Sequence, residues 1–573
     1  MSRSLHAAFV AGLLLAGRST LGQDTTITPA VACAGERVTS IDVQPEPPRI
    51  IGRSAPAWRR ALLRTVFQHA TTRESVVRSY LLLDVGEPCT PERRSESERL
   101  LRSPPFIADA TVRAFADTGG AVRIVAETVD EIPLVVNGRL RDGGISSFTY
   151  GNSNINGTGM YGSLRWTEGD AFRDGWAVRY AHYNVFDRPY RFNLHAERSP
   201  LGHDVSLALG HPFLTNLQRS AWHAGVTTRR AYTGFIRPDE YQLSLRHDRS
   251  LWNAGWVGRV GGARTGAFAG ALATHERFTP AADAIVITDT GLAAPDDDEL
   301  DGRYAAYRSY RLSGVLGLRL LDFFKAAGFD ALVAEQDVAR GIQVGGVLGR
   351  SLPWFEATDR DIHLSVDTYG GVGNARSFVG TRFEWEGRRD LRQGRWDAIV
   401  MSGRLAWYRK LAERRTLVSG VEFSGGWRER LPLQLSLGER RAGLRGYRGT
   451  TVAGGRRLVA RVEQRHARGS LTRFARWGTA VFVDAGKTWS GGVPFGETTT
   501  LRASVGGSLL AAIPQQSRRM LRVDLAVPVT PDAPDRVSVR FSAENATRTF
   551  WREPGDVSRV RAGSPASGIF SWP

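Results

Sequence analysis

The stretch LRVDLAV at residues 521–527 decides the fold, because its side chains alternate strictly between apolar residues and residues of other types. Successive side chains of an extended strand point to opposite faces, so the four apolar residues of this stretch share one face. The stretch RVSVRFSA at residues 536–543 repeats the pattern. Similar segments, about ten residues long and separated by Gly, Asp, Asn and Pro, recur from about residue 143 onward. This alternation predicts a mainly β protein made of antiparallel strands.

A transmembrane β-barrel is favoured over a soluble β-sandwich, although both alternate. No stretch after residue 22 has eighteen consecutive apolar residues, so no transmembrane helix is expected. The number of segments and the 15 Trp and 14 Tyr, which suit interfacial girdles, are typical of a membrane barrel. Sixteen or eighteen strands fit the pattern, and we predict a 16-stranded transmembrane antiparallel barrel over residues 132–551 with a tail over 552–573. Leu521, Val523, Leu525 and Val527 are expected to face lipid.

The N-terminus has the pattern of a secretory signal peptide. Arg3 and His6 form a short basic start, an apolar run extends from Ala7 to Ala16, and small residues precede Gln23. The apolar run is too short to span a bilayer, so residues 1–22 are predicted to be a signal peptide and residues 23–36 a linker. A buried N-terminal helix is the alternative. Export leads to an oxidising compartment, where a disulfide between the two cysteines can form, but their spacing leaves the pairing open.

Residues 37–131 change periodicity and predict one small α+β domain. The segment after Thr72 has apolar residues at helical spacing, and Pro91 and Glu92 open a second helix that Pro104 stops. Residues 44–70 are interpreted as an insertion between the first strand of this domain and the helix after Thr72. The expected elements are a strand at Arg37–Val43, helices at Trp58–Phe67, Glu74–Leu83 and Pro91–Leu101, and strands at Ala108–Phe115 and Ala121–Glu127.

This region resembles a polypeptide-transport-associated (POTRA) domain. The resemblance lies in ESVVR at 74–78, LLLDVG at 81–86, ERLLR at 98–102, Phe106-Ile107 and the strand over 122–127. It implies a periplasmic module with an exposed sheet edge, and such an edge can bind an extended polypeptide as an added strand. An ordinary small α+β domain is the alternative.

The C-terminal 140 residues resemble the barrel of the BamA/TamA family, also called the bacterial surface-antigen family. The motifs are Leu437-Gly438, GLRGY at 443–447, LVARVE at 458–463, VFVDAGKTW at 481–489 and ASVGG at 503–507, followed by the strand at 521–528. The resemblance implies that the loop formed by Gly443, Leu444, Arg445, Gly446 and Tyr447 folds into the lumen. It also implies that the loop arginine meets an acidic residue on the barrel wall.

Strand parity identifies the acidic partners. Asp484 shares a face with Gly478, Ala480 and Gly486, which leaves room for an incoming loop. Glu463 lies on the face opposite Ala460 and Val462. We therefore predict that Arg445 pairs with Asp484 and that Glu463 is a second acceptor.

The sequence gives no sign of an enzyme, a cofactor or a metal site. Residues 157–162 match G-x-G-x-x-G, but a strand follows them where a nucleotide site needs a helix, so we interpret them as a glycine-rich hairpin. No Gly-x-Ser-x-Gly elbow, His-Glu-x-x-His motif or P-loop occurs, and the 11 histidines lack ligand spacing. The acidic run at 295–299 is interpreted as a solvated loop, because its oxygens lack the alternation of a calcium loop.

The net charge of +18 comes almost wholly from arginines, which are spread along the chain between apolar residues. Such spreading suits a barrel lumen and rims that contact lipid phosphates better than nucleic acid, which we exclude as a partner. The leading hypothesis is an assembly or translocation barrel in the bacterial outer membrane, with its small domain in the periplasm. Its expected partners are an unfolded outer-membrane or secreted polypeptide, outer-membrane lipid including lipopolysaccharide, and accessory periplasmic proteins. The alternative is a passive outer-membrane pore or structural surface antigen.

Overall fold

The computed structural model describes residues 29–48 and 70–561, apart from 142–143, 170, 238–241, 289, 296–299, 439–442, 448–449, 451, 473, 531–536, 546–550 and 552. The predicted signal peptide, most of the acidic run and the helix expected at Trp58–Phe67 lie outside the described residues. In the described part of the chain, no helix is long and apolar enough to cross a membrane.

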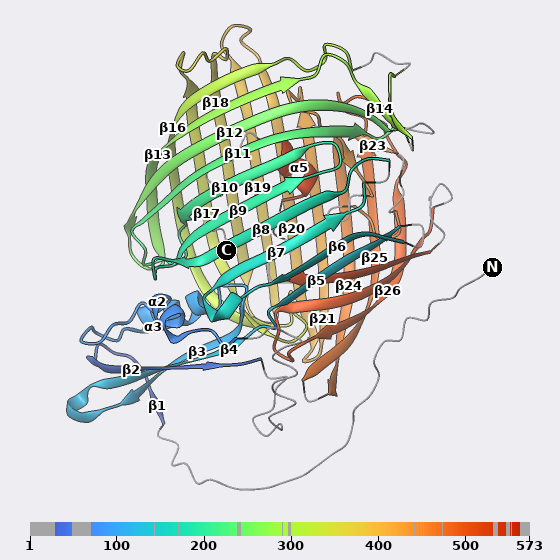
Figure 1. The fold of residues 1–573 in the computed structure, drawn as a ribbon. Helices are drawn as coiled ribbons and strands as arrows, with labels where there is room; N and C mark the ends of the chain where they lie inside the picture. Colours follow the sequence, from blue (N-terminus) through green and yellow to red (C-terminus); the bar gives the residue numbers. More distant parts are fainter. Residues whose placement is uncertain are drawn as a thin grey trace.

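A closed antiparallel barrel forms most of the molecule (Figure 1). Each strand pairs with its neighbour along the chain, and the ring closes where the last strand, β28, meets the first, β5. The wall strands are β5 (Leu134–Arg141), β6 (Gly144–Asn152), β7 (Met160–Thr167), β8 (Gly175–Val185), β9 (Tyr190–Arg198), β10 (His203–His211), β11 (Ser220–Phe235), β12 (Gln242–Gly261), β13 (Thr265–Pro280), β16 (Tyr307–Ala327), β17 (Glu335–Ser351), β18 (Asp361–Gly373), β19 (Ser377–Asp390), β20 (Trp396–Ala412), β21 (Arg415–Trp427), β24 (Arg456–Thr472), β25 (Ala475–Trp489), β26 (Arg502–Ala512), β27 (Arg519–Pro528) and β28 (Ser538–Asn545).

The predicted count of 16 strands is wrong. Twenty of the described strands form the wall, and β14 (Ile285–Thr288) and β15 (Gly291–Ala293) form a hairpin above it. This hairpin extends β12, while β13 pairs directly with β16. The undercount has a physical reason: alternation shows which face a residue occupies but not where one strand ends and the next begins, and β8, β9 and β10 are separated by connections of only four residues.

The outer face of the wall is apolar and the inner face is polar. Leu521, Leu525 and Val527 are exposed on the outside, whereas Arg522 and Asp524 are buried within. The predicted outward direction of this face is therefore confirmed. The same parity holds on the longest strand, β16, where Leu312, Leu316, Leu318 and Leu320 are exposed and Arg311 and Arg319 are buried. An apolar belt around a polar interior is the arrangement that a membrane-spanning barrel requires.

A small four-stranded sheet with two helices precedes the barrel. Its strand order is β1-β3-β4-β2, with β2 at one edge, and it contains the predicted β-α-α-β-β succession plus a two-residue strand. The first helix is shorter than predicted and ends at Ser79. The elements are β1 (Ala30–Val31), β2 (Val38–Glu46), α2 (Glu74–Ser79), α3 (Pro91–Leu101), β3 (Ile107–Ala116), a 3₁₀ turn (Thr118–Gly120) and β4 (Val122–Asp130).

A disulfide joins Cys33 to Cys89, whose Cα atoms lie 5.1 Å apart. Both cysteines are buried in the hydrophobic core of the small domain. The bond connects the segment before β2 to the start of α3, which Thr90 caps by accepting a hydrogen bond from the Arg93 amide. The structure thus shows that the two cysteines pair with each other, which their spacing in the sequence leaves open.

The small domain is held against one end of the barrel (Figure 1). Arg102 of α3 donates to both carboxylate oxygens of Asp337 on β17, at 2.9 and 2.7 Å. Glu131, just after β4, accepts from the hydroxyl of Ser517 before β27. The hairpin at 157–162 also belongs to this contact: Gly157 has a φ of +70°, and a Cβ there would lie 2.1 Å from the Thr71 carbonyl oxygen. Glycine is required at this position by both the turn and the close approach.

Candidate functional site: the loop inside the barrel

The connection between β21 and β24 enters the barrel and carries the predicted site residues. Its stem is a two-stranded sheet of β22 (Leu435–Ser436) and β23 (Ala453–Gly454). Leu437, Leu444 and Tyr447 pack with the wall residue Val459 in one buried cluster. Val459 is fully buried and lies on the inner face of β24, since Val462, of the opposite parity on the same strand, is 47% exposed. The loop therefore fills part of the lumen.

Arg445 is the centre of the loop contact. Its Nε and Nη2 donate to the two carboxylate oxygens of Asp484 at 2.7 and 2.6 Å, and its Nη1 donates to Glu463 at 2.8 Å. Its backbone amide donates to Asp484 as well, at 3.3 Å. The guanidinium carbon also lies 3.4 Å from the ring centroid of Phe482. Arg445 thus forms the bidentate geometry with Asp484 that only arginine supplies.

Wall geometry places these two acids inward. Val481 and Val483 are 63% and 50% exposed on the outside of β25, so Asp484 of the other parity lies inside, with no exposed surface. Glu463 on β24 accepts from Arg465 and Arg522 in addition to Arg445. The three arginines and two carboxylates form a buried network that joins the loop to β24, β25 and β27. Buried charges require this kind of pairing.

The other loop residues bring the chain close to the last wall strands. Gly446 has a φ of +90°, and a Cβ there would lie 3.1 Å from Pro528 at the end of β27. Tyr447 is fully buried and its hydroxyl donates to the Ala503 carbonyl at 3.0 Å. The Gly443 carbonyl accepts from Arg461 at 2.7 Å. The structure therefore brings together Gly443 to Tyr447, Glu463 and Asp484, which are the residues proposed from sequence.

The C-terminal segment has a place in the site that sequence reasoning missed, since the sequence predicts only a tail after the last strand. Helix α5 (Gly555–Val560) lies within the ring of strands (Figure 1), where Asp556 and Val557 are buried. The predicted tail does follow the last described strand, β28, but the strand pattern does not predict that its described part returns into the ring. A sequence signal exists: Pro554 and Gly555 before an acidic first turn are typical of a helix start. Alternation ends at β28, so the strand pattern could not place this helix.

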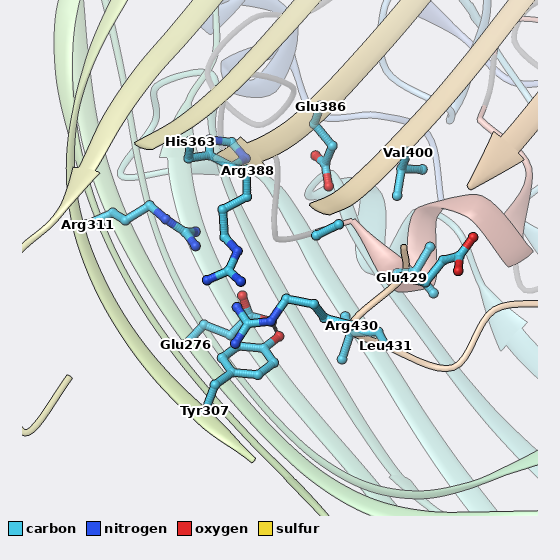
Figure 2. A pocket seen from close by; sticks show the side chains of 12 residues that line it. Glu276, Tyr307, Arg311, His363, Glu386, Arg388, Val400, Glu429, Arg430 and Leu431 are labelled. Atoms are coloured by element: carbon cyan, nitrogen blue, oxygen red, sulfur yellow. Dashed lines mark hydrogen bonds between the residues drawn. The ribbon is translucent and has the colours of Figure 1, made fainter. Parts of the chain in front are cut away.

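A second charged cluster lies where α5 meets the wall. It lines a cavity of about 30 Å³, enough for one or two waters. Figure 2 shows the guanidinium groups of Arg311, Arg388 and Arg430 converging there beside Glu276 and Tyr307. Their charges are matched by carboxylates, because Asp361 accepts from Arg311 and Arg388, and Asp359 accepts from Arg430. The cluster thus joins wall strands and the β21–β24 loop instead of presenting free charge.

Metal chemistry finds no support in the described residues: no group of three or more His, Cys, Asp and Glu side chains there could hold a metal ion. The inward-facing charged groups described above are engaged in ion pairs. These ion pairs hold segments of the chain inside the barrel.

No family model matches the sequence, and neither does any curated protein. Among solved structures, the chain is similar to BamA from Haemophilus ducreyi lacking POTRA domains 1-3, with 12% identity and a TM-score of 0.36, over 89% of this chain and 85% of that one. It is similar to CdiB from Escherichia coli with 11% identity and a TM-score of 0.38, over 91% and 92% of the two chains. A third similar structure is OccK5 (OpdH) from Pseudomonas aeruginosa, with 9% identity and a TM-score of 0.29, over 71% and 93%. At such identities and TM-scores, the role of this chain rests on its own geometry.

Proposed function

We propose that this protein is an outer-membrane barrel that inserts or secretes polypeptide, with its small domain in the periplasm receiving an unfolded client. The observation that carries the proposal is a small sheet, with β2 at its edge, fixed at the barrel mouth by Arg102, Asp337 and Glu131. Backbone groups on a sheet edge bind an extended chain as an added strand. A client bound there is delivered to the opening of the barrel.

The closing seam supports the same function. The strands that meet there, β5 and β28, contain 8 residues each, whereas β12 and β16 on the other side contain 20 and 21. An edge opened in lipid leaves backbone groups unpaired, and each such group costs several kcal/mol. Short strands lower this cost, so the seam is the place where a client strand can enter the wall most easily.

The occupied lumen favours this function over a passive pore. The Arg445 loop and α5 both lie inside the ring, in the path that ions and small solutes need. A passive pore gains nothing from an interior filled with paired charges. The proposed partners are an unfolded outer-membrane or secreted polypeptide, outer-membrane lipid including lipopolysaccharide, and accessory periplasmic proteins.

Depletion of the protein followed by a proteome of the outer membrane tests the proposal. Loss of many barrels indicates insertion, and loss of one secreted protein indicates secretion. A photo-crosslinking residue at the exposed Gln44 on β2 should then capture the affected client, whereas one at Arg113 on β3, two strands away, should not. An unchanged proteome together with no crosslink at Gln44 would contradict the proposal.

A further inference from the structure

The C-terminal segment, defined here as Trp551 together with residues 553–561, crosses the barrel interior and contacts distant parts of the wall. Its contacts lie on β12, β18, β19, β20 and β24. Within the ring order, β12 and β24 are separated by β13 and by β16 to β21. A segment of this length that reaches both sides obstructs the lumen instead of lining it.

Apolar packing holds the helix of this segment. Val557 is 1% exposed and Val560 is also buried, in a cluster with Leu243 and Leu245 of β12 and Val400 of β20. The cluster also contains Leu435 in the stem of the Arg445 loop, together with Leu431 and Leu433, which lie between β21 and that stem. By contrast, Ser558 and Arg559 on the other side of the helix are exposed. The helix is therefore amphipathic, and its apolar side closes the space between the wall and the loop.

Arginines of the wall hold the same segment from two directions, one through an ion pair and one through hydrogen bonds to backbone carbonyls. Arg457 on β24, itself only 1% exposed, donates to both carboxylate oxygens of Asp556 at 2.6 and 3.3 Å. At the other end, Arg249 on β12 donates to the carbonyls of Arg559 and Arg561 at 2.7 and 2.8 Å. A cation at the C-terminal end of a helix satisfies carbonyls that lack intrahelical partners.

The wall has a niche for the start of the segment. A Cβ on Gly380 of β19 would lie 2.6 Å from the Trp551 ring, so the ring occupies the space that a side chain would fill. The Trp551 carbonyl accepts from Arg404 and Arg382, at 2.7 and 3.1 Å. The same ring packs edge-on against Tyr369 of β18, with centroids 5.9 Å apart. These contacts are specific to this segment and are made by side chains, not by strand pairing.

We propose that the C-terminal segment is a built-in plug that closes the barrel lumen to ions and small solutes. Side-chain contacts can break without unpairing a single wall strand, so the plug can leave while the barrel stays closed on itself. The plug also packs on the stem of the Arg445 loop, so movement of the loop and release of the plug are mechanically connected. The proposal does not depend on which client, if any, the barrel transports.

Conductance of the purified full-length protein in planar lipid bilayers tests the plug. The wild type should stay mostly closed. Val557→Asp places a charge in the apolar cluster and should convert the closed state to a steadily open one, while Ser558→Asp adds the same charge to the exposed side and should stay closed. A chain that ends at residue 550 should be open throughout. Heat-modifiable gel mobility shows for each variant whether the barrel has folded.

Opening of every plug variant that folds, with a closed wild type and a closed Ser558→Asp control, supports the proposal. It is overturned if the wild type already conducts freely, or if the shortened chain folds and conducts no more than the wild type. Failure of both plug variants to fold also overturns it, because the segment is then a permanent part of the core. None of these outcomes requires polypeptide transport, so they separate the plug from the proposed function.

Discussion

Removal of the Arg445 side chain is the perturbation that most directly tests the docked loop. In Arg445→Ala, the loop loses three side-chain hydrogen bonds to Asp484 and Glu463 and the contact with the Phe482 ring. Glu463 keeps Arg465 and Arg522 as partners. Asp484 loses its bidentate partner at a position with no exposed surface.

The burial of the three side chains determines how much stability Arg445→Ala should lose. The side chains of Arg445, Glu463 and Asp484 are 10%, 7% and 0% exposed. Breaking a buried pair by removing one partner costs roughly 3–5 kcal/mol, because the remaining charge stays desolvated. We expect a loss of that size in the free energy of unfolding, caused mainly by the carboxylate of Asp484.

Urea unfolding in detergent micelles, followed by tryptophan fluorescence and gel mobility, measures this loss. Arg230→Ala is the matched control, because Arg230 also pairs with an aspartate on the adjacent strand, Asp248, but both side chains are about half exposed. The free energy of unfolding of Arg230→Ala is expected to differ little from that of the wild type. In a double-mutant cycle, Arg445→Ala and Asp484→Asn should be non-additive by about 0.5–3 kcal/mol.

Two results would refute the reasoning. If Arg445→Ala destabilises the barrel no more than Arg230→Ala does, the loop is not docked through a dry ion pair. If the two changes in the cycle are simply additive, Arg445 and Asp484 do not act on one another. Charge reversal gives a functional version of the same test, since Arg445→Asp and Asp484→Arg should each impair assembly or transport and the double exchange should recover part of it.

Three further predictions concern the membrane face, the disulfide and the domain contact. Phe148→Arg on the outer face of β6 should destabilise the barrel in lipid by about 2–4 kcal/mol if it lies near the midplane, and Thr149→Arg on the inner face should cost less; equal effects would refute the assigned faces. Loss of the Cys33–Cys89 bond, which closes a separation of 56 residues, should lower the stability of the small domain by up to about 4 kcal/mol. The double variant Cys33→Ser, Cys89→Ser should therefore be cleaved faster than the wild type in pulse proteolysis, and unchanged proteolysis would contradict this. Burial raises the pKa of Glu98, but hydrogen bonds from Arg102 and Lys325 outweigh it and hold this pKa below its ordinary value of 4.5. The stabilisation is therefore present at neutral pH and is lost as the pH falls below 4.5, so hydrogen exchange of α3 should rise in acid, and less so in Glu98→Gln, which already lacks the charge.

The strand pattern predicts the barrel wall well because the type of each residue, apolar or polar, indicates which face of the wall it occupies. Period-2 alternation alone shows that Leu521, Leu525 and Val527 share one face, and the interpretation as a membrane barrel then predicts that this face is the outer one. Arg445, Asp484 and Glu463 could be matched partly for a related reason, since parity places each acid on the face opposite the apolar residues of its strand. The rest of the match comes from the family resemblance, which implies that the loop arginine meets an acidic residue on the wall. The functional role of these residues stays a prediction.

Two features could not be predicted because they depend on distant contacts. The number of strands depends on where short hairpins turn, and β14 and β15 stand outside the wall only because β13 pairs with β16. The position of the C-terminal segment depends on Arg249, Arg404 and Arg457, which come from three different strands. Each of these arginines has the same local pattern as any other inward wall arginine, and only the closed ring directs them at one segment.

The arginine-rich composition has a common physical explanation in these contacts. The side chains of the wall do not fill the interior of a wide barrel. Charged side chains that line such an interior must be hydrated or paired with opposite charges. In this barrel, segments of the chain itself pair with charged side chains of the wall. The loop brings Arg445 to wall carboxylates, and the C-terminal segment brings Asp556 and backbone carbonyls to wall arginines. The charged groups of such pairs can bond to water once the interior is hydrated, whereas the backbone groups of a strand unpaired in lipid have no such substitute. A barrel that must remain sealed in the membrane and yet clear its interior is therefore better served by ion-paired fillers than by additional strands.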